Sequence, residues 1–275
     1  MGSIEGHEGS WAYVKGGMGT ISEALAKSAR EKGVEIILNS DIEKVLMVNN
    51  KATGIRLVDG KEISSKIVLS NATPEVTFKH LVDPKDLPEN FNKAIDNIDY
   101  SCGAMKINLV VNKLPDFTCL PNKDQQKAGP QHMGTIHFEN SLEEIDTAFK
   151  QAYDGLAANP PCVEMTLPSA HDESITKPRY HICQLFIQYA PYEAHGIAKY
   201  NSKDGMELDL PNKSNMWSND NAKEAYKNVV YDRIEEFAPG FKASIVHEDV
   251  LTPWDLERIF GLTKGNIFHG SLNLN

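Results

Sequence analysis

The residues best suited to ligand chemistry are the glycines in front of the first predicted helix. Gly16, Gly17 and Gly19 directly precede an apolar, helix-periodic segment that begins at Thr20. Glycine allows the backbone to approach a ligand closely, and the free N–H groups of a helix N-terminus favour an electron-rich group. The spacing is not GxGxxG, because Ser22 stands where the third glycine would be. Glycines before a helix are also ordinary loop residues, so the residues alone leave both a ligand role and a structural turn open.

Several standard catalytic and metal-binding motifs are absent from the sequence. It has no HExxH, no GxSxG and no EF-hand loop, and the segment from Gly54 to Lys61 is one residue too long for a nucleotide-binding P-loop. His132 and His137 are five residues apart, which puts them on opposite faces of an extended segment, so two ordinary histidines are favoured over a metal site. His269 has no carboxylate at a recognisable spacing, which favours a structural or surface role. These residues identify no general base, nucleophile or metal site.

Composition and charge restrict the classes of protein to which the chain can belong. The 275 residues include 28 Lys and Arg against 38 Asp and Glu, for a formal net charge of −10. Binding to nucleic acid draws on clustered basic residues, which this acidic chain does not assemble, so no nucleic-acid partner is expected. No apolar stretch approaches the roughly 20 residues of a membrane span. The length suits one large domain or two small ones.

The elements around the glycines follow from apolar periodicity and turn residues. A helix is predicted over 20–32, with Thr20 and Glu23 as a capping box, an apolar face, and Gly33 as the left-handed stop. After this helix, β-branched runs and an Asp-Gly turn predict a series of short strands. These strands are expected at 34–38, 42–48, 52–57, 62–63 and 66–70.

The remainder of the chain mixes helices with strands. Alternation of apolar and polar residues predicts a half-buried strand over 105–111, and a helix is predicted between Ser141 and Gly155. Residues 193–217 show no periodicity and are expected to form a long exposed loop. The further elements expected are strands at 162–167 and 180–189 and a helix over 222–237. The stripe expected to be buried on the helix after Ser141 comprises Leu142, Ile145, Phe149 and Ala152.

Taken in order, these residues resemble the phytoene desaturase-like branch of the FAD-dependent oxidoreductases. Each piece is short and common, but their joint order and spacing is specific. The resemblance spans essentially the whole chain and is weakest over 193–217. The segments that carry it are Tyr13 to Ala26, Gly33 to Ile36, Val45, Gly54 to Leu57, Asp59-Gly60, Val68 to Pro74, Ala238 to Lys242, Leu251 to Leu262 and Gly265 to Gly270.

The resemblance implies an α/β fold of mixed α+β character. Residues 1–75 would form part of an FAD-binding domain, residues 76–252 a substrate-binding domain with a mixed sheet and covering helices, and residues 253–275 a segment that returns towards the FAD-binding domain. Members of the family carry GxGxxG before this region and a second Gly-rich segment after it, and neither is present in these residues. The chain is therefore expected to be the middle-to-late part of a longer protein.

The cofactor implied by the resemblance is FAD, which takes a hydride while the protein supplies orientation and electrostatics. The glycine-rich turn would approach the isoalloxazine ring, the backbone of Val45 would meet the adenine, and Asn71 would lie where the chain re-enters the FAD-binding domain. His269 and Gly270 would lie near the flavin face. The cofactor-binding residues implied in this way are Gly16, Gly17, Met18, Val45, Asn71, His269 and Gly270.

The function implied by the resemblance is that of an FAD-dependent oxidoreductase, similar to phytoene desaturases and amine oxidases, with an unknown small-molecule substrate. The resemblance also implies a location in the mitochondrial matrix and a respiratory-chain protein as partner. Two alternatives stay open: a partner-binding protein without enzymatic activity on a flavoprotein-like fold, and an inactive truncated product. The substrate, the catalytic residues and the oligomeric state do not follow from the sequence.

Overall fold

The computed structural model describes residues 3–4, 6–8, 12–101, 103–199, 206–207 and 215–271. Its α-helices are α1 (Gly19–Glu31), α2 (Glu89–Asp96), α3 (Leu142–Tyr153), α4 (Asp220–Phe237), α5 (Phe241–Ser244) and α6 (Pro253–Phe260). Its β-strands are β1 (Ser3–Ile4), β2 (His7–Glu8), β3 (Ile42–Val48), β4 (Lys51–Leu57), β5 (Glu62–Ser64), β6 (Ala104–Val111), β7 (Ile136–His137), β8 (Leu156–Ala157), β9 (Cys162–Thr166), β10 (His181–Gln188), β11 (Gly196–Ile197), β12 (Met206–Glu207) and β13 (Ile245–Leu251). The predicted mixture of helices and sheets is confirmed, with parallel pairing of β8 and β11 beside antiparallel sheets.

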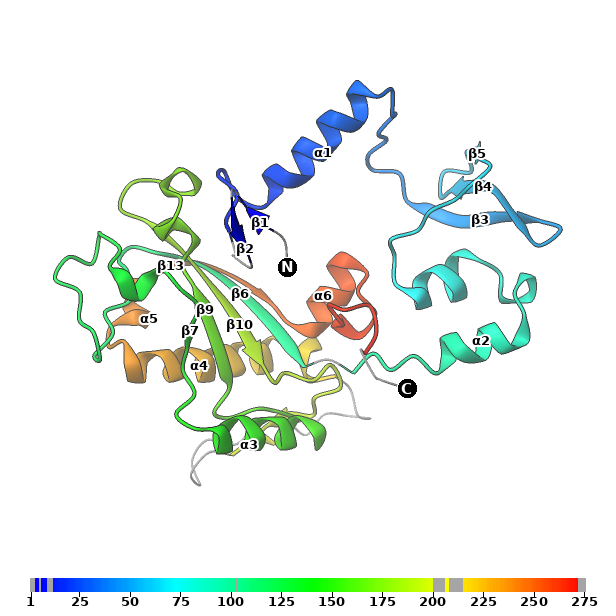
Figure 1. The fold of residues 1–275 in the computed structure, drawn as a ribbon. Coiled ribbons are helices and arrows are strands. Elements are labelled where there is room, and N and C mark those ends of the chain that lie inside the picture. The colour runs from blue at the N-terminus through cyan, green and yellow to red at the C-terminus, as the bar shows by residue number, and fades with distance from the viewer. Residues whose placement is uncertain are drawn as a thin grey trace.

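An antiparallel sheet in the order β13-β6-β10-β9-β7 forms the centre of the larger part of the molecule (Figure 1). Its register places Asn108 opposite Gln184, and Gln184 opposite Thr166. Because successive side chains of a strand point to opposite faces, these three polar residues share one face and the apolar residues between them share the other. The apolar face is buried, and its large members include Met105, Ile107, Leu109, Met165, Leu185 and Ile187.

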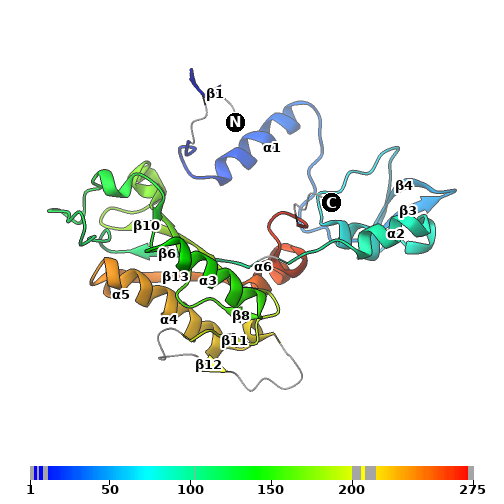
Figure 2. The ribbon, with the colours of Figure 1, turned by 60° about the horizontal axis from the view of Figure 1, so that its bottom comes forward.

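The long helix α4 packs against this apolar face. Asn219 caps it by accepting hydrogen bonds from two backbone N–H groups of the first turn, and Tyr226, Val230 and Ile234 belong to the same core as the sheet. Figures 1 and 2 show α3 and α4 on one side of the sheet and α1 on the other. The predicted amphipathic helix over 222–237 is confirmed, and it leaves the polar face of the sheet free.

Two charged residues of α4 are buried, although apolar periodicity does not predict it. Lys227 donates a hydrogen bond of 2.5 Å to Glu248 on β13, and Arg233 lies 2.6 Å from Glu144 on α3. A buried charge is tolerated when an opposite charge and hydrogen bonds compensate its lost hydration. These ion pairs therefore join α4 to the strand and the helix beside it.

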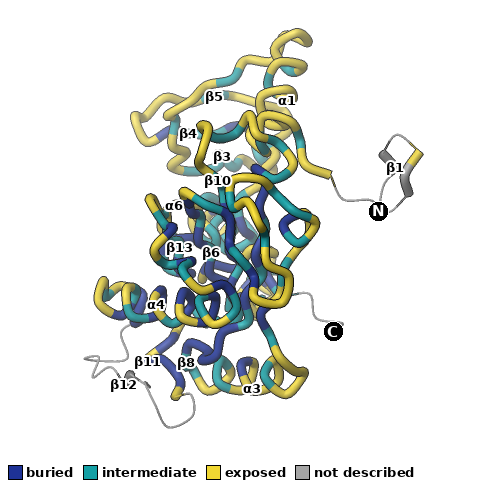
Figure 3. Tube along the Cα trace, turned by 90° about the vertical axis from the view of Figure 1, so that its left-hand side faces the viewer, coloured by how far each residue is buried: buried dark blue, intermediate teal, exposed yellow. Residues whose placement is uncertain are grey.

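Residues 12–70 are much less buried than the central sheet and α4 (Figure 3). Helix α1 has no buried residue, and β3, β4 and β5 form a separate antiparallel sheet. Near the end of α1, Gly33 has a φ of +82°, so the predicted left-handed stop is confirmed. This part of the chain therefore gains little stability from apolar burial of its own.

The start of α1 differs from the predicted one. The capping box of Thr20 and Glu23 is wrong, because the helix already begins at Gly19 and its N-cap is Met18, which makes no side-chain cap. Thr20 is thus a residue of the first turn, and its hydroxyl is not at the capping position.

The strands predicted at 34–38 and 66–70 do not form. Among the described residues, no strand pairs with either segment. Most of their apolar side chains are exposed to solvent, and Leu69 is 91% exposed. A β-branched composition favours an extended backbone, but a strand also needs a neighbour that supplies its ladder of hydrogen bonds.

The helix α3 forms as predicted, but its predicted buried stripe is wrong. Ser141 caps the helix, with its Oγ accepting a hydrogen bond of 3.3 Å from the backbone N–H of Glu144. Leu142 is 80% exposed, and Ile145 and Phe149 are exposed as well. The large apolar side chains of α3 therefore face solvent, whereas Ala152 is half-buried.

Polar contacts set the rotation of α3. Glu144, Ala148 and Gln151 share one face, at positions i, i+4 and i+7. Glu144 pairs with the buried Arg233, Ala148 is buried, and Gln151 exchanges hydrogen bonds of 2.9 and 3.1 Å with the backbone of Asn159. Since a buried, unpaired guanidinium is costlier than an exposed leucine, these contacts decide which face turns inward.

Parts of the segment 193–217 are buried, so its prediction as one long exposed loop is wrong. Strand β11 pairs with β8, and the buried Trp217 donates a hydrogen bond of 2.7 Å to the carbonyl oxygen of Pro191. Periodicity does not detect this burial, because a strand of two residues and a single aromatic side chain are too short to repeat. Residues 200–205 and 208–214 lie outside the described residues.

The C-terminal segment packs against the residues that precede the central sheet. The hydroxyls of Thr73 and Thr263 share a buried hydrogen bond of 2.6 Å, and the N–H of Ser271 donates to the carbonyl oxygen of Asp99 at 2.7 Å. These contacts join segments that are far apart in the sequence. The domain boundaries at 75 and 252 stay predictions.

Substitution of a buried and of an exposed leucine, Leu185 and Leu142, tests this fold. Leu185 is 0% exposed, so Leu185→Ala is expected to lower the free energy of unfolding by about 2–5 kcal/mol. The same substitution at the exposed Leu142 is expected to change it by less than about 0.5 kcal/mol. Urea unfolding followed by circular dichroism measures both. A large loss in Leu142→Ala would show that α3 buries its apolar face.

Asp255 on α6 predicts a dependence of stability on pH. Burial raises its pKa, but hydrogen bonds from Lys223, Thr252 and Arg258 outweigh burial and lower the pKa to about 2. A carboxyl whose pKa is lower in the folded state stabilises the fold above its unfolded pKa. That contribution, roughly 2 kcal/mol, is lost as the pH falls from about 5 towards 2. In Asp255→Asn the unfolding free energy should fall less steeply over this range, and an unchanged slope would contradict the role of Asp255.

Candidate functional site

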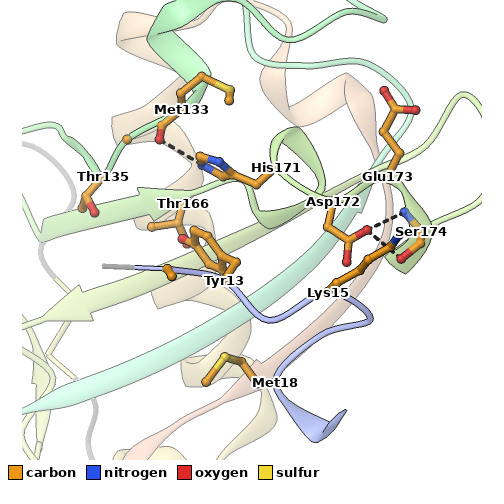
Figure 4. A pocket seen from close by; sticks show the side chains of 12 residues that line it. Tyr13, Lys15, Met18, Met133, Thr135, Thr166, His171, Asp172, Glu173 and Ser174 are labelled. Atoms are coloured by element: carbon orange, nitrogen blue, oxygen red, sulfur yellow. Dashed lines mark hydrogen bonds between the residues drawn. The ribbon is translucent and has the colours of Figure 1, made fainter. Parts of the chain in front are cut away.

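A cavity of about 1160 Å³ lies between the segment before α1 and the end of strand β9 (Figure 4). The first wall comes from residues 12–18. The second wall comes from β9 and the loops at 133–135 and 171–174. The wall formed by β9 belongs to the face of the sheet that α4 leaves free. The side chains that line the cavity include Tyr13, Lys15, Met18, Met133, Thr166 and His171.

The glycine-rich turn of the first wall has a backbone that favours glycine. Gly16 and Gly17 have φ angles of +88° and +91°, in the left-handed region. The N–H of Gly17 donates to the carbonyl oxygen of Val14 at 3.0 Å, and the N–H of Thr20 donates to that of Gly17 at 3.1 Å. The chain thus reverses and enters α1 at Gly19, with bare backbone beside the cavity.

The carboxylate of Asp172 joins this turn to the opposite wall. Its Oδ2 accepts a hydrogen bond of 2.6 Å from the N–H of Gly16, 156 positions away in the sequence. Its Oδ1 accepts from the N–H and the hydroxyl of Ser174, at 3.0 and 2.6 Å. The hydrogen bonds from Ser174 and Gly16, with a smaller contribution from the charge of Lys15, lower the pKa of Asp172. Asp172 is therefore ionised at neutral pH.

A stacked pair of rings makes a second contact between the walls. The ring centroids of Tyr13 and His171 are 5.0 Å apart, and the ring planes are inclined by 25°. Nε2 of His171 lies 2.9 Å from the carbonyl oxygen of Met133, and because a carbonyl only accepts, Nε2 carries the proton. Figure 4 shows this bond, which orients the imidazole beside Tyr13.

The chemistry offered by these walls is that of binding and orientation. Tyr13, Met18 and Met133 present apolar surface, while Thr135 and Thr166 present hydroxyl groups. The imidazole of His171 already donates its Nε2 proton within the wall. The arrangement suits a ligand with an apolar body whose own reactive group carries the reaction.

The predicted cofactor-binding residues fall in three places. Gly16, Gly17 and Met18 lie at the cavity, and Met18 lines it. Val45 lies in the middle of β3, on the separate sheet, which Figure 1 shows away from β9 and the start of α1. Asn71 is exposed and lies two residues before the Thr73–Thr263 bond. The structure thus places Val45 and Asn71 outside the walls of the cavity.

His269 and Gly270 lie in the C-terminal segment. His269 is exposed, with a φ of +59°, and Gly270 is buried against Ile98. They belong to the same region as the Thr73–Thr263 bond, so this region brings together Asn71, His269 and Gly270 but not the glycine-rich turn. Within the described residues, no group of three or more His, Cys, Asp or Glu side chains is arranged to hold a metal ion.

The cavity fits the ring end of FAD. A Cβ at Gly16 would lie 3.0 Å from the hydroxyl of Thr20 in the same segment, and one at Gly17 would lie 3.8 Å from Ile175, which is an ordinary contact. The positive φ angles, rather than a lack of space, therefore favour glycine at this turn. The volume of about 1160 Å³ exceeds what a tricyclic ring requires. The lining residues include the stacked Tyr13 and the thioethers of Met18 and Met133, which suit a flat aromatic system.

Sequence reasoning missed Asp172, His171 and Tyr13 as members of the site. Asp172 precedes Ser174 in an Asp-x-Ser pattern, which predicts a local turn in which the aspartate accepts from the backbone two residues on. Nothing local predicts that the same carboxylate reaches Gly16. Their role at the site becomes visible only in the tertiary structure, which brings residues 171 and 172 next to residues 13 and 16.

Comparison with known proteins identifies related sequences over the whole chain. Residues 2–173 match the family model of flavin containing amine oxidoreductases. The chain is 40% identical over 279 residues to pyridine nucleotide-disulfide oxidoreductase domain-containing protein 2 of Mus musculus, covering 100% of this chain and 45% of that protein. It is 26% identical to the chloroplastic prolycopene isomerase of Daucus carota, covering 94% of this chain and 36% of that protein. The chain thus spans less than half the length of these curated relatives.

A solved structure shares the fold. The crystal structure of an oxidoreductase from Methanosarcina mazei aligns with 86% of this chain and 42% of its own, with a TM-score of 0.51 and 15% sequence identity. Among the described residues, no helix is both long and apolar enough to cross a membrane.

The two glycines flanking Met18 give a matched test of the turn. Gly17→Ala places a Cβ at a φ of +91°, which costs about 1–2 kcal/mol, and is expected to increase hydrogen exchange over residues 12–20. Gly19 lies within the helix, where alanine is favoured by up to about 1 kcal/mol and meets no atom within 4 Å. In Gly19→Ala, hydrogen exchange over residues 12–20 should therefore be as fast as in the unmodified protein, or slower. Equal exchange in both variants would contradict the left-handed turn.

Proposed function

The chain belongs to the flavin containing amine oxidoreductase family, in its phytoene desaturase-like branch, and from this premise we propose that it forms part of an FAD-dependent oxidoreductase. The observation that carries the proposal is the cavity between the glycine-rich turn and the second wall. It joins the residues that the family resemblance assigns to the flavin with a face of the sheet that is free to meet a substrate. The chemistry supplied by the bound flavin is hydride acceptance.

In this proposal the chain's own residues bind and orient. The backbone at Gly16 and Gly17 and the side chain of Met18 would hold the ring. Asn71, Val45, His269 and Gly270 are proposed as further cofactor contacts from the resemblance. Tyr13 and Met133 are partly exposed, and their apolar surfaces would be covered by a bound ring.

The lining of the cavity supports a class of substrate. Tyr13, Met18 and Met133 form an apolar surface, and the hydroxyls of Thr135 and Thr166 lie on the opposite wall. We propose a small molecule with an apolar body and a polar end that accepts or donates a hydrogen bond. The relatives of the chain include a prolycopene isomerase and a 4,4'-diapophytoene desaturase, so small-molecule chemistry is found among similar proteins.

The place of action is proposed from the resemblance alone. A location in the mitochondrial matrix and contact with a respiratory-chain protein are the expectations that it supports. Fractionation of cells that express the tagged protein, with protease protection of isolated mitochondria, tests the location. Recovery outside the organelle would contradict it.

The proposed function predicts flavin binding that depends on the cavity. The protein, in the longest form that its gene encodes, is titrated with FAD and followed by flavin fluorescence and absorbance. We expect saturable binding, and we expect Met18→Glu to weaken it by about tenfold or more, because a ring bound against the exposed position 18 would remove the hydration of a carboxylate there.

The matched control is Leu25→Glu, on the exposed surface of α1 away from the cavity lining. This variant introduces the same charge into the same helical segment and should bind FAD as the unmodified protein does. Failure of the unmodified protein to bind FAD would refute the oxidoreductase proposal. Equal weakening by both substitutions would show that the cavity is not the flavin site.

A further inference from the structure

We propose that Asp172 is a positioning residue, whose carboxylate holds the glycine-rich turn against the second wall and thereby sets the width of the cavity for the flavin ring. The inference deepens the proposed function and rests on it for the identity of the ligand. The hydrogen bond between Gly16 and Asp172 is present without any ligand, so it does not depend on the proposed function.

Few contacts other than the hydrogen bond between Asp172 and Gly16 hold residues 12–33 to the rest of the described chain. Among the described residues, it is the one hydrogen bond that joins residues 12–33 to a distant part of the chain. Helix α1 has no buried residue, so apolar packing does not hold this segment in place. The stack of Tyr13 on His171 is the other specific contact, and it involves the residue next to Asp172.

The carboxylate is fixed in the geometry that this role needs. Ser174 donates two hydrogen bonds to Oδ1, one from its backbone and one from its hydroxyl, which leaves Oδ2 directed at Gly16. Asp172 also caps the short helical turn of Glu173–Ile175, so its backbone belongs to the second wall. A carboxylate accepts from a backbone N–H more strongly than a neutral acceptor does.

The position of the bond relative to the cavity gives it a functional consequence. Lys15 and Met18, on either side of the Gly16-Gly17 turn, line the cavity, and so does Asp172 itself. Figure 4 shows Lys15 and Asp172 on facing segments. When the bond opens, the turn and the side chain of Met18 are free to move away from the second wall, and a ring bound between the walls loses contact with one of them.

The first experiment measures the contact without any ligand. Hydrogen exchange is followed in the peptide that covers residues 12–18 of the flavin-free protein. Asp172→Ala removes a hydrogen bond to a charged acceptor, and we expect exchange there to rise by about tenfold. Asp172→Asn keeps an acceptor oxygen and should restore part of the protection. Ser174→Ala removes one of the two hydrogen bonds that orient the carboxylate and keeps the acceptor itself, so it should raise exchange over 12–18 less than Asp172→Ala does.

The matched control is Asp83→Ala. Asp83 caps another short helical turn by accepting from the N–H of Lys85 at 3.0 Å, and it does not line the cavity. This variant loses the same kind of cap, so it should leave exchange over 12–18 unchanged. If Asp172→Ala behaves like Asp83→Ala in this peptide, Asp172 is only a local cap and the proposal is overturned.

The second experiment measures the consequence for the flavin. FAD is titrated into the same variants, and the dissociation constant and the shape of the flavin absorbance band are recorded. We expect Asp172→Ala to weaken FAD binding by about tenfold and to alter the band, with a smaller effect in Asp172→Asn and none in Asp83→Ala. Unchanged binding in Asp172→Ala, together with increased exchange, would overturn the role in setting the cavity. If the unmodified protein binds no FAD, the proposed function fails, and the exchange experiment still decides whether Asp172 holds the turn.

Discussion

The structure depends most on the burial of one face of the central antiparallel sheet beneath α4. Strands β6 and β10 alternate fully buried apolar residues with half-buried residues, most of them polar, and α4 contributes Tyr226, Val230 and Ile234 to the same core. Removal of apolar surface from water drives this packing. Because α4 occupies the apolar face, the polar face with Asn108 and Thr166 remains free to meet another part of the chain.

The segment that meets it is held in a different way. Residues 12–33 contribute no buried helix face, and they reach the second wall through the bond from Gly16 to Asp172 and the stack of Tyr13 on His171. Regions with few buried apolar contacts open at a lower free energy than the core does. The cavity therefore combines a firmly packed wall with one held by a few directed contacts, an arrangement that lets a ligand order its own site.

Local signals predicted the elements that repeat a simple pattern over several residues. The alternation over 105–111 and the apolar stripe over 222–237 both correspond to observed elements, and Gly33 adopts the predicted left-handed conformation. The same signals failed where a distant partner decides the outcome. Residues 34–38 have strand-like composition without a neighbouring strand, and α3 turns a small alanine inward because its Glu144 pairs with Arg233.

The candidate site also combines features that local sequence predicts with features that distant contacts decide. By itself, the sequence determined the glycine-rich turn, its place before a helix, the resemblance of the ordered segments to a flavin-dependent family and the absence of standard nucleophile motifs. Only the tertiary structure decided that Asp172 and His171 face Gly16 and Tyr13 and that Val45 lies on another sheet. The physical reason is the sequence distance over which each interaction acts. Turn and helix preferences act over a few neighbouring residues, whereas the hydrogen bond across 156 positions exists only after burial of the sheet has fixed the second wall.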